Sequence, residues 1–272
     1  MIDLSGKVAI VTGAGRGIGH AIATQLSQQG ATLVVNDLDP GPAHETASSL
    51  GHNALAISGD ITAADFPQHL VDRVLAERGA IDIIVNNAGY TWDNVIQKTT
   101  DEQFQAMLDI HVKAPFRLLR AASGYLREAA KRETSEGRRV MRKVVNITSI
   151  AATDGGAGQA GYGSGKAGVI GLTRVLAKEW GRYNVNVNCV GFGLIATRLI
   201  QPMTPDVEPL HIHGRDIKIG VQPAMLEATK TTCPLGRPGT TDEAAGPVLF
   251  FCSPLSDYVT GEVLIVSGGM HF

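Results

Sequence analysis

The sequence predicts an α/β fold in which one parallel sheet of about seven strands is covered by helices on both faces. Short apolar runs of strand length alternate with longer amphipathic segments along the 272 residues. Within the runs the apolar residues are continuous, which is typical of strands that are buried on both faces of a parallel sheet. No linker, internal repeat or low-complexity segment interrupts the alternation. We therefore expect a single domain over residues 1–272.

The first predicted strand, residues 7–12, leads directly into a glycine-rich loop and then a helix over roughly 18–29. The loop reads Gly13-Ala14-Gly15-Arg16-Gly17-Ile18-Gly19. Glycines let the backbone approach a ligand closely, and a helix N-terminus offers unpaired N–H groups and the positive end of the helix dipole. This order predicts a cradle for the phosphates of a dinucleotide in a Rossmann-type, doubly wound sheet.

The second predicted strand, residues 31–36, ends in Asp37, eighteen residues beyond Gly19. A carboxylate at this place accepts hydrogen bonds from both hydroxyls of the adenosine ribose and repels a 2′-phosphate. Leu38 offers no compensating cation, whereas Arg16 in the loop is compatible with either a 2′-phosphate or the pyrophosphate. We expect NAD as the cofactor, with NADP less favoured. A tight turn with a solvated aspartate is the alternative interpretation.

The remaining elements continue the alternation. Pro115, which has no N–H to donate, predicts a bend inside a long helix. The predicted elements are a strand at 54–57, a helix at about 65–78, a strand at 81–85, a helix from Thr100 or Asp101 to about Lys131, a strand at about 143–147, a helix at about 161–183, a strand at 185–189, a helix that begins near 241–243 and a strand at 263–266.

Two side chains of the 161–183 helix form a candidate pair for proton transfer. Tyr162 and Lys166 are four residues apart and so share one helix face, and Ser149 lies thirteen positions before Tyr162 at a strand end. A nearby cation stabilises a phenolate and lowers the pKa of a tyrosine. Ser149 can hold a substrate oxygen while Tyr162 passes it a proton. The alternative is an exposed helix pair that arises by chance.

These motifs together resemble the short-chain dehydrogenase/reductase family of NAD(P)-dependent oxidoreductases. The resemblance covers nearly the whole chain, and the nearest pattern is that of 3-oxoacyl-acyl-carrier-protein reductases and related hydroxyacyl-thioester dehydrogenases. The matching segments are residues 12–19, Asn86-Asn87-Ala88-Gly89, Ser149, Tyr162, Lys166, and the C-terminal segments 234–239, 260–262 and 266–269.

The resemblance implies a role for each matching residue. Ser149, Tyr162 and Lys166 would be catalytic, and Lys166 would also bind the nicotinamide ribose. Asn86 would be structural. The implied cofactor contacts are Gly13, Arg16, Gly17, Ile18 and Gly19 at the pyrophosphate and nearby ribose, Asp37 at the adenosine ribose, Asp60 and Ile61 at the adenine, Asn87, Ala88 and Gly89 along the central portion, and Phe192, Gly193, Ile195 and Thr197 at the nicotinamide.

The chain departs from the family pattern at two positions. His111 stands where the family usually has an asparagine that positions a water between the lysine and bulk solvent. Imidazole can hold the same water or can titrate, and a purely structural histidine is the alternative. Phe192 replaces the usual proline after the sixth strand. This change either loosens the wall around the nicotinamide or lets Phe192 pack on it.

Residues 198–233 form a long insertion before the last helix, which we interpret as an ordered substrate lid. It contains four prolines, a possible hairpin near 212–221 and a helical piece at about 223–231. His211 and His213 lie two residues apart, so a metal site is conceivable. Because no third ligand is near in sequence, we favour two exposed lid histidines and expect no metal.

The segment 127–143 carries seven basic and three acidic residues. Charge runs of this kind are usually solvated, so an extended helix end is the favoured interpretation. A landing surface for coenzyme A phosphates or for an acidic carrier protein is the alternative.

Composition narrows the class of protein further. A net charge of −2 argues against a nucleic-acid partner, no apolar stretch of about 18 residues exists, and the N-terminus lacks a signal-peptide pattern. We expect no membrane partner and a cytoplasmic location, with Cys189, Cys233 and Cys252 as reduced thiols. The resemblance implies a homotetramer, in which the apolar run 247–252 and residues 268–272 could be buried against a partner.

The sequence thus predicts a reversible NAD-linked oxidoreductase that interconverts a secondary alcohol and a ketone, with a 3-oxoacyl or 3-hydroxyacyl thioester as the leading substrate class. A dehydrogenase of cyclic, steroid-like or sugar alcohols is the first alternative. A catalytically silent NAD-binding protein is the second, which the intact Ser149, Tyr162 and Lys166 argue against.

Overall fold

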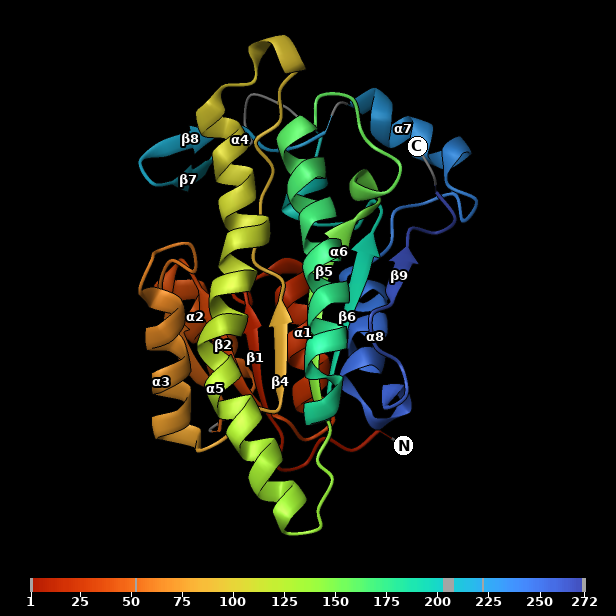
Figure 1. Cartoon of the computed structure of the whole chain (residues 1–272). Helices are drawn as coiled ribbons and strands as arrows, with labels where there is room; N and C mark the ends of the chain where they lie inside the picture. The colour runs from red at the N-terminus through yellow and green to blue at the C-terminus, as the bar shows by residue number, and fades with distance from the viewer. Residues whose placement is uncertain (1, 52, 203–207, 222, 271–272) are drawn as a thin grey trace.

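The computed structural model describes residues 2–51, 53–202, 208–221 and 223–270. Its centre is a seven-stranded sheet with the strand order β3-β2-β1-β4-β5-β6-β9, in which every neighbouring pair is parallel (Figure 1). The strands are β1 (Val8–Thr12), β2 (Thr32–Asp37), β3 (Leu55–Ser58), β4 (Ile83–Asn86), β5 (Arg142–Ser149), β6 (Val185–Phe192) and β9 (Val263–Val266). The order of the chain reverses at β1, so a crevice opens between the carboxyl ends of β1 and β4.

Helices cover both faces of the sheet, as predicted. One apolar cluster joins the sheet to α3 (Phe66–Arg78), α4 (Asp101–Leu108), α5 (Ala114–Ser135) and α6 (Ala160–Trp180), and a second joins it to α1 (Gly17–Gln28), α2 (Pro40–Ser49) and α8 (Thr241–Cys252). Neighbours in one strand point into different clusters: Ile10 belongs to the first, and Ala9 and Val11 belong to the second. This double burial explains why the strands read as continuous apolar runs.

Helix α2 was not predicted. Its sequence contains two prolines, one glycine and several polar residues, and only Ala43, Thr46 and Ala47 are buried. The prolines and glycine indicate a loop in the sequence, but the first proline lies in the first turn, where its missing N–H breaks no hydrogen bond. Small side chains then suffice to pack this short helix on the sheet.

The long helix predicted from Thr100 to Lys131 is divided by a π-helical turn at Asp109–Lys113 and extends to Ser135. A π turn contains an extra residue per turn and is frequent at functional sites. It places Pro115 in the first turn of α5. The turn that absorbs the proline also carries His111, so this irregularity sets the position of a predicted site residue.

The lid lies between β6 and α8, as predicted. It begins with the short helix η5 (Arg198–Ile200), continues with the antiparallel strands β7 (Leu210–Ile212) and β8 (Arg215–Ile217), and ends in α7 (Pro223–Thr232). The hairpin therefore starts two residues earlier than predicted. Pro205, in the lid, and His271 and Phe272, which were expected at a partner contact, lie outside the described residues.

The basic segment 127–143 lies at the end of the sheet where the strands begin, which is opposite the crevice at their carboxyl ends. Two of its cations are buried: Arg142 forms two hydrogen bonds of 2.6 and 2.8 Å with the Glu133 carboxylate, and the Lys143 ammonium donates to Asn186, Ser256 and Asp257. Strand β5 runs for roughly 23 Å from Arg142 to its carboxyl end at Ser149. The location does not favour a landing surface for a molecule that enters the crevice.

In the part of the chain that the structure describes, no helix combines the length and the apolar character needed to cross a bilayer.

Candidate active site

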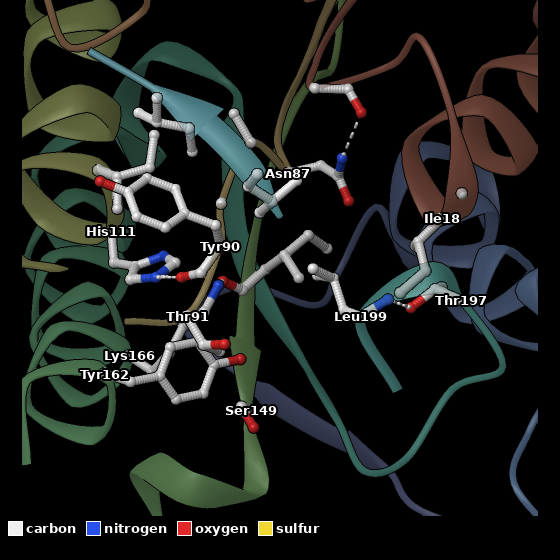
Figure 2. Close-up of a pocket in the computed structure, with 18 of the residues that line it drawn as sticks. Ile18, Asn87, Tyr90, Thr91, His111, Ser149, Tyr162, Lys166, Thr197 and Leu199 are labelled. Atoms are coloured by element: carbon white, nitrogen blue, oxygen red, sulfur yellow. Dashed lines mark hydrogen bonds between the residues drawn. The ribbon is translucent and has the colours of Figure 1, made fainter. Parts of the chain in front are cut away.

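A cavity of about 1400 Å³ occupies the crevice at the carboxyl ends of the strands. Its volume exceeds the ~300–1,000 Å³ typical of sites for one small ligand, so it has room for a dinucleotide and a substrate together. Every residue that the sequence analysis assigned to catalysis or to cofactor binding lines this cavity. Figure 2 shows His111, Tyr162 and Lys166 on one side of it and Ile18, Thr197 and Leu199 on the other.

The glycine loop between β1 and α1 has the shape of a phosphate cradle. Gly17 has a φ of +58°, and a Cβ atom there would meet only Thr197 within 4 Å, at 3.7 Å. Gly19 has no such room, because a Cβ atom would lie 2.1 Å from the Gly13 carbonyl oxygen. Asn87 supports the loop by donating from Nδ2 to the carbonyls of Thr12 and Gly13 at 2.9 and 3.0 Å. The residues present therefore fit a dinucleotide phosphate beside Gly17.

The far end of the cavity carries the acids expected around adenosine. Asp37 ends β2, and its Oδ2 accepts from the Gly15 N–H at 2.8 Å. Asp39, which the sequence analysis did not assign, pairs with Arg16 at 2.8 Å and so neutralises the cation of the glycine loop. Asp60 follows β3 and accepts from both the N–H and the hydroxyl of Thr62.

Ser149, Tyr162 and Lys166 meet at the other end of the cavity, where β5 ends and α6 begins. Ser149 Oγ accepts from the Ala151 N–H at 3.2 Å, which leaves its hydroxyl hydrogen able to donate to a ligand. The Lys166 ammonium donates to the Ile147 carbonyl at 2.9 Å and lies 5.7 Å from the Tyr162 ring centre. The Thr148 hydroxyl of β5 donates a 2.7 Å hydrogen bond to the Lys166 carbonyl of α6 and so links the two elements.

Burial governs the protonation of this group. It raises the pKa of Tyr162 to about 12, with the hydrogen bond to Ser149 acting in the opposite direction and the Asp93 carboxylate adding to the rise. Burial also lowers the pKa of Lys166 to about 8. Lys166 was expected to lower the Tyr162 pKa, but burial of the phenol is the largest influence on that pKa and raises it. Tyr162 is thus a protonated hydrogen-bond donor at neutral pH.

His111 lies between these groups and the loop after β4. Its Nε2 is 2.9 Å from the Tyr90 carbonyl oxygen, and its ring meets the Tyr162 ring edge-on at 5.1 Å (Figure 2). Burial, reinforced by the Lys166 charge, holds the His111 pKa well below its ordinary value. The neutral ring donates from Nε2, because a carbonyl can only accept. Its Nδ1 is buried and has no hydrogen-bond partner among the described residues.

Phe192 is part of the sheet rather than a loose wall. It is the last residue of β6, is 5% exposed, and pairs in register with Ser149 on one side and Val266 on the other. The following N–H, from Gly193, donates to the Val266 carbonyl at 3.0 Å. Without a proline the strand continues through this position, so Phe192 packs at the base of the cavity and does not loosen it.

A group of buried polar residues, which the sequence analysis mostly missed, joins β4, β5 and α6 behind the cavity. Asn86, predicted to be structural, donates to the Asn146 side chain at 2.8 Å, and Asn146 donates to Thr173 of α6 at 2.9 Å. All three are buried. A polar residue inside an apolar strand run, as Asn146 is, was the available signal for this network.

Comparison with known proteins gives consistent matches over the full length. A family model described as enoyl-(acyl carrier protein) reductase matches residues 13–271. The 3-oxoacyl-[acyl-carrier-protein] reductase of Vibrio harveyi is 34% identical over 270 residues, which cover 99% of each chain.

Two solved structures are similar to the whole chain. A gluconate 5-dehydrogenase from Burkholderia cenocepacia in complex with NADP and tartrate has a TM-score of 0.84 and 27% identity, with 98% of this chain and 96% of that chain covered. A 3-ketoacyl-(acyl-carrier-protein) reductase from Brucella melitensis complexed with NADH has a TM-score of 0.83 and 26% identity, with 99% and 100% covered.

Proposed function

The chain belongs to the short-chain dehydrogenase/reductase family and is an NAD(P)-dependent oxidoreductase of hydroxyl and keto groups, and we propose that it uses NAD to interconvert a 3-oxoacyl thioester and its 3-hydroxy form. The observation that supports this most strongly is the position of Ser149, Tyr162 and Lys166, which share one cavity with the glycine cradle. The same trio makes a catalytically silent protein the weaker interpretation.

The bound nicotinamide would supply or accept the hydride. The chain's own residues hold the substrate oxygen and move the proton. Ser149 donates a hydrogen bond to the carbonyl oxygen, and Tyr162, protonated because its pKa is about 12, gives that oxygen its proton as the alcohol forms. Lys166 is close enough for its charge to stabilise the phenolate left behind.

His111 would hold a water through which a proton returns to Lys166 and this site. Its unpartnered Nδ1 and the Lys166 ammonium are both near Gly89: a Cβ atom on Gly89 would lie 3.1 Å from Nδ1 and 3.7 Å from Nζ. A water between the two groups would accept from Lys166 and donate to Nδ1. The lowered pKa of His111 favours this role, in which the ring stays neutral, over direct titration.

Charge at the adenosine end supports NAD over NADP. Asp37 ends β2, where the family resemblance puts the adenosine ribose, and Asp39 already pairs with Arg16, the cation that would otherwise receive a 2′-phosphate. A 2′-phosphate there would therefore meet two carboxylates, the Arg16 cation that Asp39 compensates, and Arg198, whose charge interacts with both of these carboxylates and with Arg16. The similar solved structures hold NADP in one case and NADH in the other, so the preference rests on these residues.

The similarity to 3-oxoacyl reductases over nearly the whole chain supports a thioester substrate. Apolar side chains of the lid segment before the hairpin, Leu199 and Ile200, line the cavity and would contact an acyl chain. A sugar-alcohol dehydrogenase is the second candidate, because the gluconate 5-dehydrogenase structure is equally similar. We also propose a cytoplasmic homotetramer, in keeping with the sequence analysis.

The test is to follow reduced nicotinamide absorbance with NADH and NADPH against acetoacetyl thioester, a keto-sugar acid and a cyclic ketone. We expect turnover with NADH and the thioester. A Tyr162→Phe protein should lose about 10²–10⁴-fold in kcat and still bind NADH. Turnover with the keto-sugar acid alone would favour the second candidate, and preference for NADPH would contradict the role given to Asp37 and Asp39.

A further inference from the structure

The lid hairpin is joined at its tip to the adenine end of the cavity. Strands β7 and β8 are connected by His213 and Gly214, whose φ values of 53° and 74° are those of a tight two-residue hairpin turn. His213 Nε2 lies 2.8 Å from Oδ2 of Asp60, which follows β3 by two residues and which the family resemblance assigns to the adenine. The contact joins residues 153 positions apart in sequence.

Other contacts hold the same hairpin, both next to its turn and at its open end. Arg215 pairs with Glu102 of α4 at 2.5 Å and lies 5.4 Å from the Trp92 ring centre. Leu210 and Ile217 are 7% and 1% exposed and belong to the apolar cluster that contains Ile61. Figure 1 shows the hairpin beside α4, on the side of the molecule where α2 and α3 lie. It is thus a packed cover over the adenosine half of the cavity.

Hydrogen bonds from the described residues leave one acceptor position of the Asp60 carboxylate open. Its Oδ1 accepts from the Thr62 N–H at 2.8 Å and from the Thr62 hydroxyl at 2.7 Å, and its Oδ2 pairs with His213. An ionised carboxylate offers about four acceptor positions. The fourth, on Oδ2, can accept from the exocyclic amino group of an adenine. His213 and the adenine would then share one oxygen atom.

We propose that His213 is a positioning residue of the adenosine subsite: by donating from Nε2 to Asp60 it orients this carboxylate and holds the hairpin closed over the bound adenosine. The inference rests on the proposed cofactor function. Because the hairpin must lift before adenosine can leave, the His213–Asp60 bond slows release of the cofactor. The nicotinamide half, at the far end of the cavity, does not depend on it.

The chain offers a matched pair of variants. His213→Asn suits the left-handed turn, where asparagine is favoured, but its side chain is too short to reach Asp60 in the same way. His211→Asn changes a histidine of the same hairpin that is 68% exposed and pairs with its cross-strand neighbour Asp216 instead of Asp60. Calorimetry would measure the binding of ADP, NADH and nicotinamide mononucleotide to each protein. Stopped-flow experiments would measure the rate of NADH release. Thermal unfolding midpoints would show whether each variant is folded.

We expect His213→Asn to weaken ADP and NADH binding by about tenfold, the loss of one hydrogen bond to a charged group, and to speed NADH release. Nicotinamide mononucleotide binding should be unchanged, and His211→Asn should match the unaltered protein in every assay. Unchanged ADP binding in His213→Asn, or an equal loss in His211→Asn, would overturn the inference. If the unaltered protein bound neither ADP nor NADH, the proposed function itself would fail.

Discussion

At the residue scale, the burial of the Lys166 ammonium lowers the stability of the folded protein. It is 5% exposed, and its ammonium is removed from water with a single carbonyl, that of Ile147, as its hydrogen-bond partner among the described residues. Burial therefore disfavours the charged form and lowers its pKa to about 8. The charge that the proposed mechanism assigns to Lys166 is therefore kept at a cost in free energy to the folded state.

This cost predicts that Lys166→Met is more stable than the unaltered protein at pH 7, by about 2 kcal/mol. Between pH 8 and 10.5 the unfolded chain binds one more proton at Lys166 than the folded chain does, so the unaltered protein gains stability as pH rises through this window. The gap between the two proteins should be largest below pH 8 and close towards pH 10.5. Urea unfolding at several pH values measures the difference in unfolding free energy between the two proteins. A difference that did not change with pH would contradict the lowered pKa of Lys166.

His111 gives a second prediction at this scale, because its proposed work is done by a neutral ring. His111→Asn should keep kcat within about threefold, whereas His111→Leu, which can hold no water, should lose at least about tenfold. NADH affinity should change little in either. Since the His111 pKa is held well below its ordinary value, the pH–rate profile of the unaltered protein should show no step near pH 6.5. A step there that vanishes in His111→Asn would show that His111 titrates.

The site residues differ in how far sequence could locate them. Tyr162, Lys166 and the glycine loop are fixed by local spacing, which folding preserves. The Arg16–Asp39 pair depends on side-chain conformation, and the direction of the Tyr162 pKa depends on burial by residues distant in sequence. Neither property has a local pattern. Phe192 could not be interpreted without knowing that β9 pairs with β6 at that position.

At the scale of the element, the glycines of α6 explain how Tyr162 reaches His111. A Cβ atom on Gly165 would lie 2.8 Å from the Met107 carbonyl oxygen, and one on Gly161 would lie 3.2 Å from the Met107 side chain. The glycines therefore allow α6 to lie directly against α4 and the π turn. Glycine is otherwise unfavourable inside a helix, so its use here marks a close approach.

We accordingly expect Gly165→Ala to destabilise the protein by about 1–3 kcal/mol, because backbone must shift to admit the methyl group. It should also lower kcat, since the shift separates Tyr162 from His111. Gly171→Ala is the matched control: it lies in the same helix, has nothing within 4 Å of its Cβ position, and should gain up to about 1 kcal/mol from helix propensity. Thermal unfolding and kcat would be measured for both variants. Equal stabilities would show that a methyl group at residue 165 does not clash with the Met107 carbonyl.

Strands and helices could be predicted where the spacing of their apolar residues is regular. An element that packs through small residues, such as α2, could not. The seven strands and the long helices follow from apolar runs and helical spacing. Helix α2 has too few apolar residues to show a pattern. The hairpin was placed two residues too late because its turn uses a positive φ at His213, which is uncommon for any residue other than glycine. The π turn inserts one extra residue into the helix, and no distinctive residue composition marks its place in the sequence.

For the whole molecule, the outer face formed by α5 and α6 is the candidate interface between subunits. Phe116 and Val175 are 44% and 53% exposed there, and a groove lined by both helices runs between Phe116 and Tyr183. We expect Phe116→Arg to split a tetramer into dimers, because a charge would be buried in the shared face. Analytical ultracentrifugation would show the change. Arg182→Glu, at the polar margin of the groove, should leave the assembly intact, and a monomeric unaltered protein would contradict the proposal.

The contact between Arg215 and Trp92 also gives the chain an intrinsic optical signal. Of its two tryptophans, Trp180 is buried in the core and Trp92 lies against the hairpin. When the hairpin lifts, the guanidinium leaves the indole ring of Trp92, and only that residue changes its surroundings. In a Trp180→Phe protein, the emission spectrum would therefore follow hairpin opening in real time, without a label and without turnover.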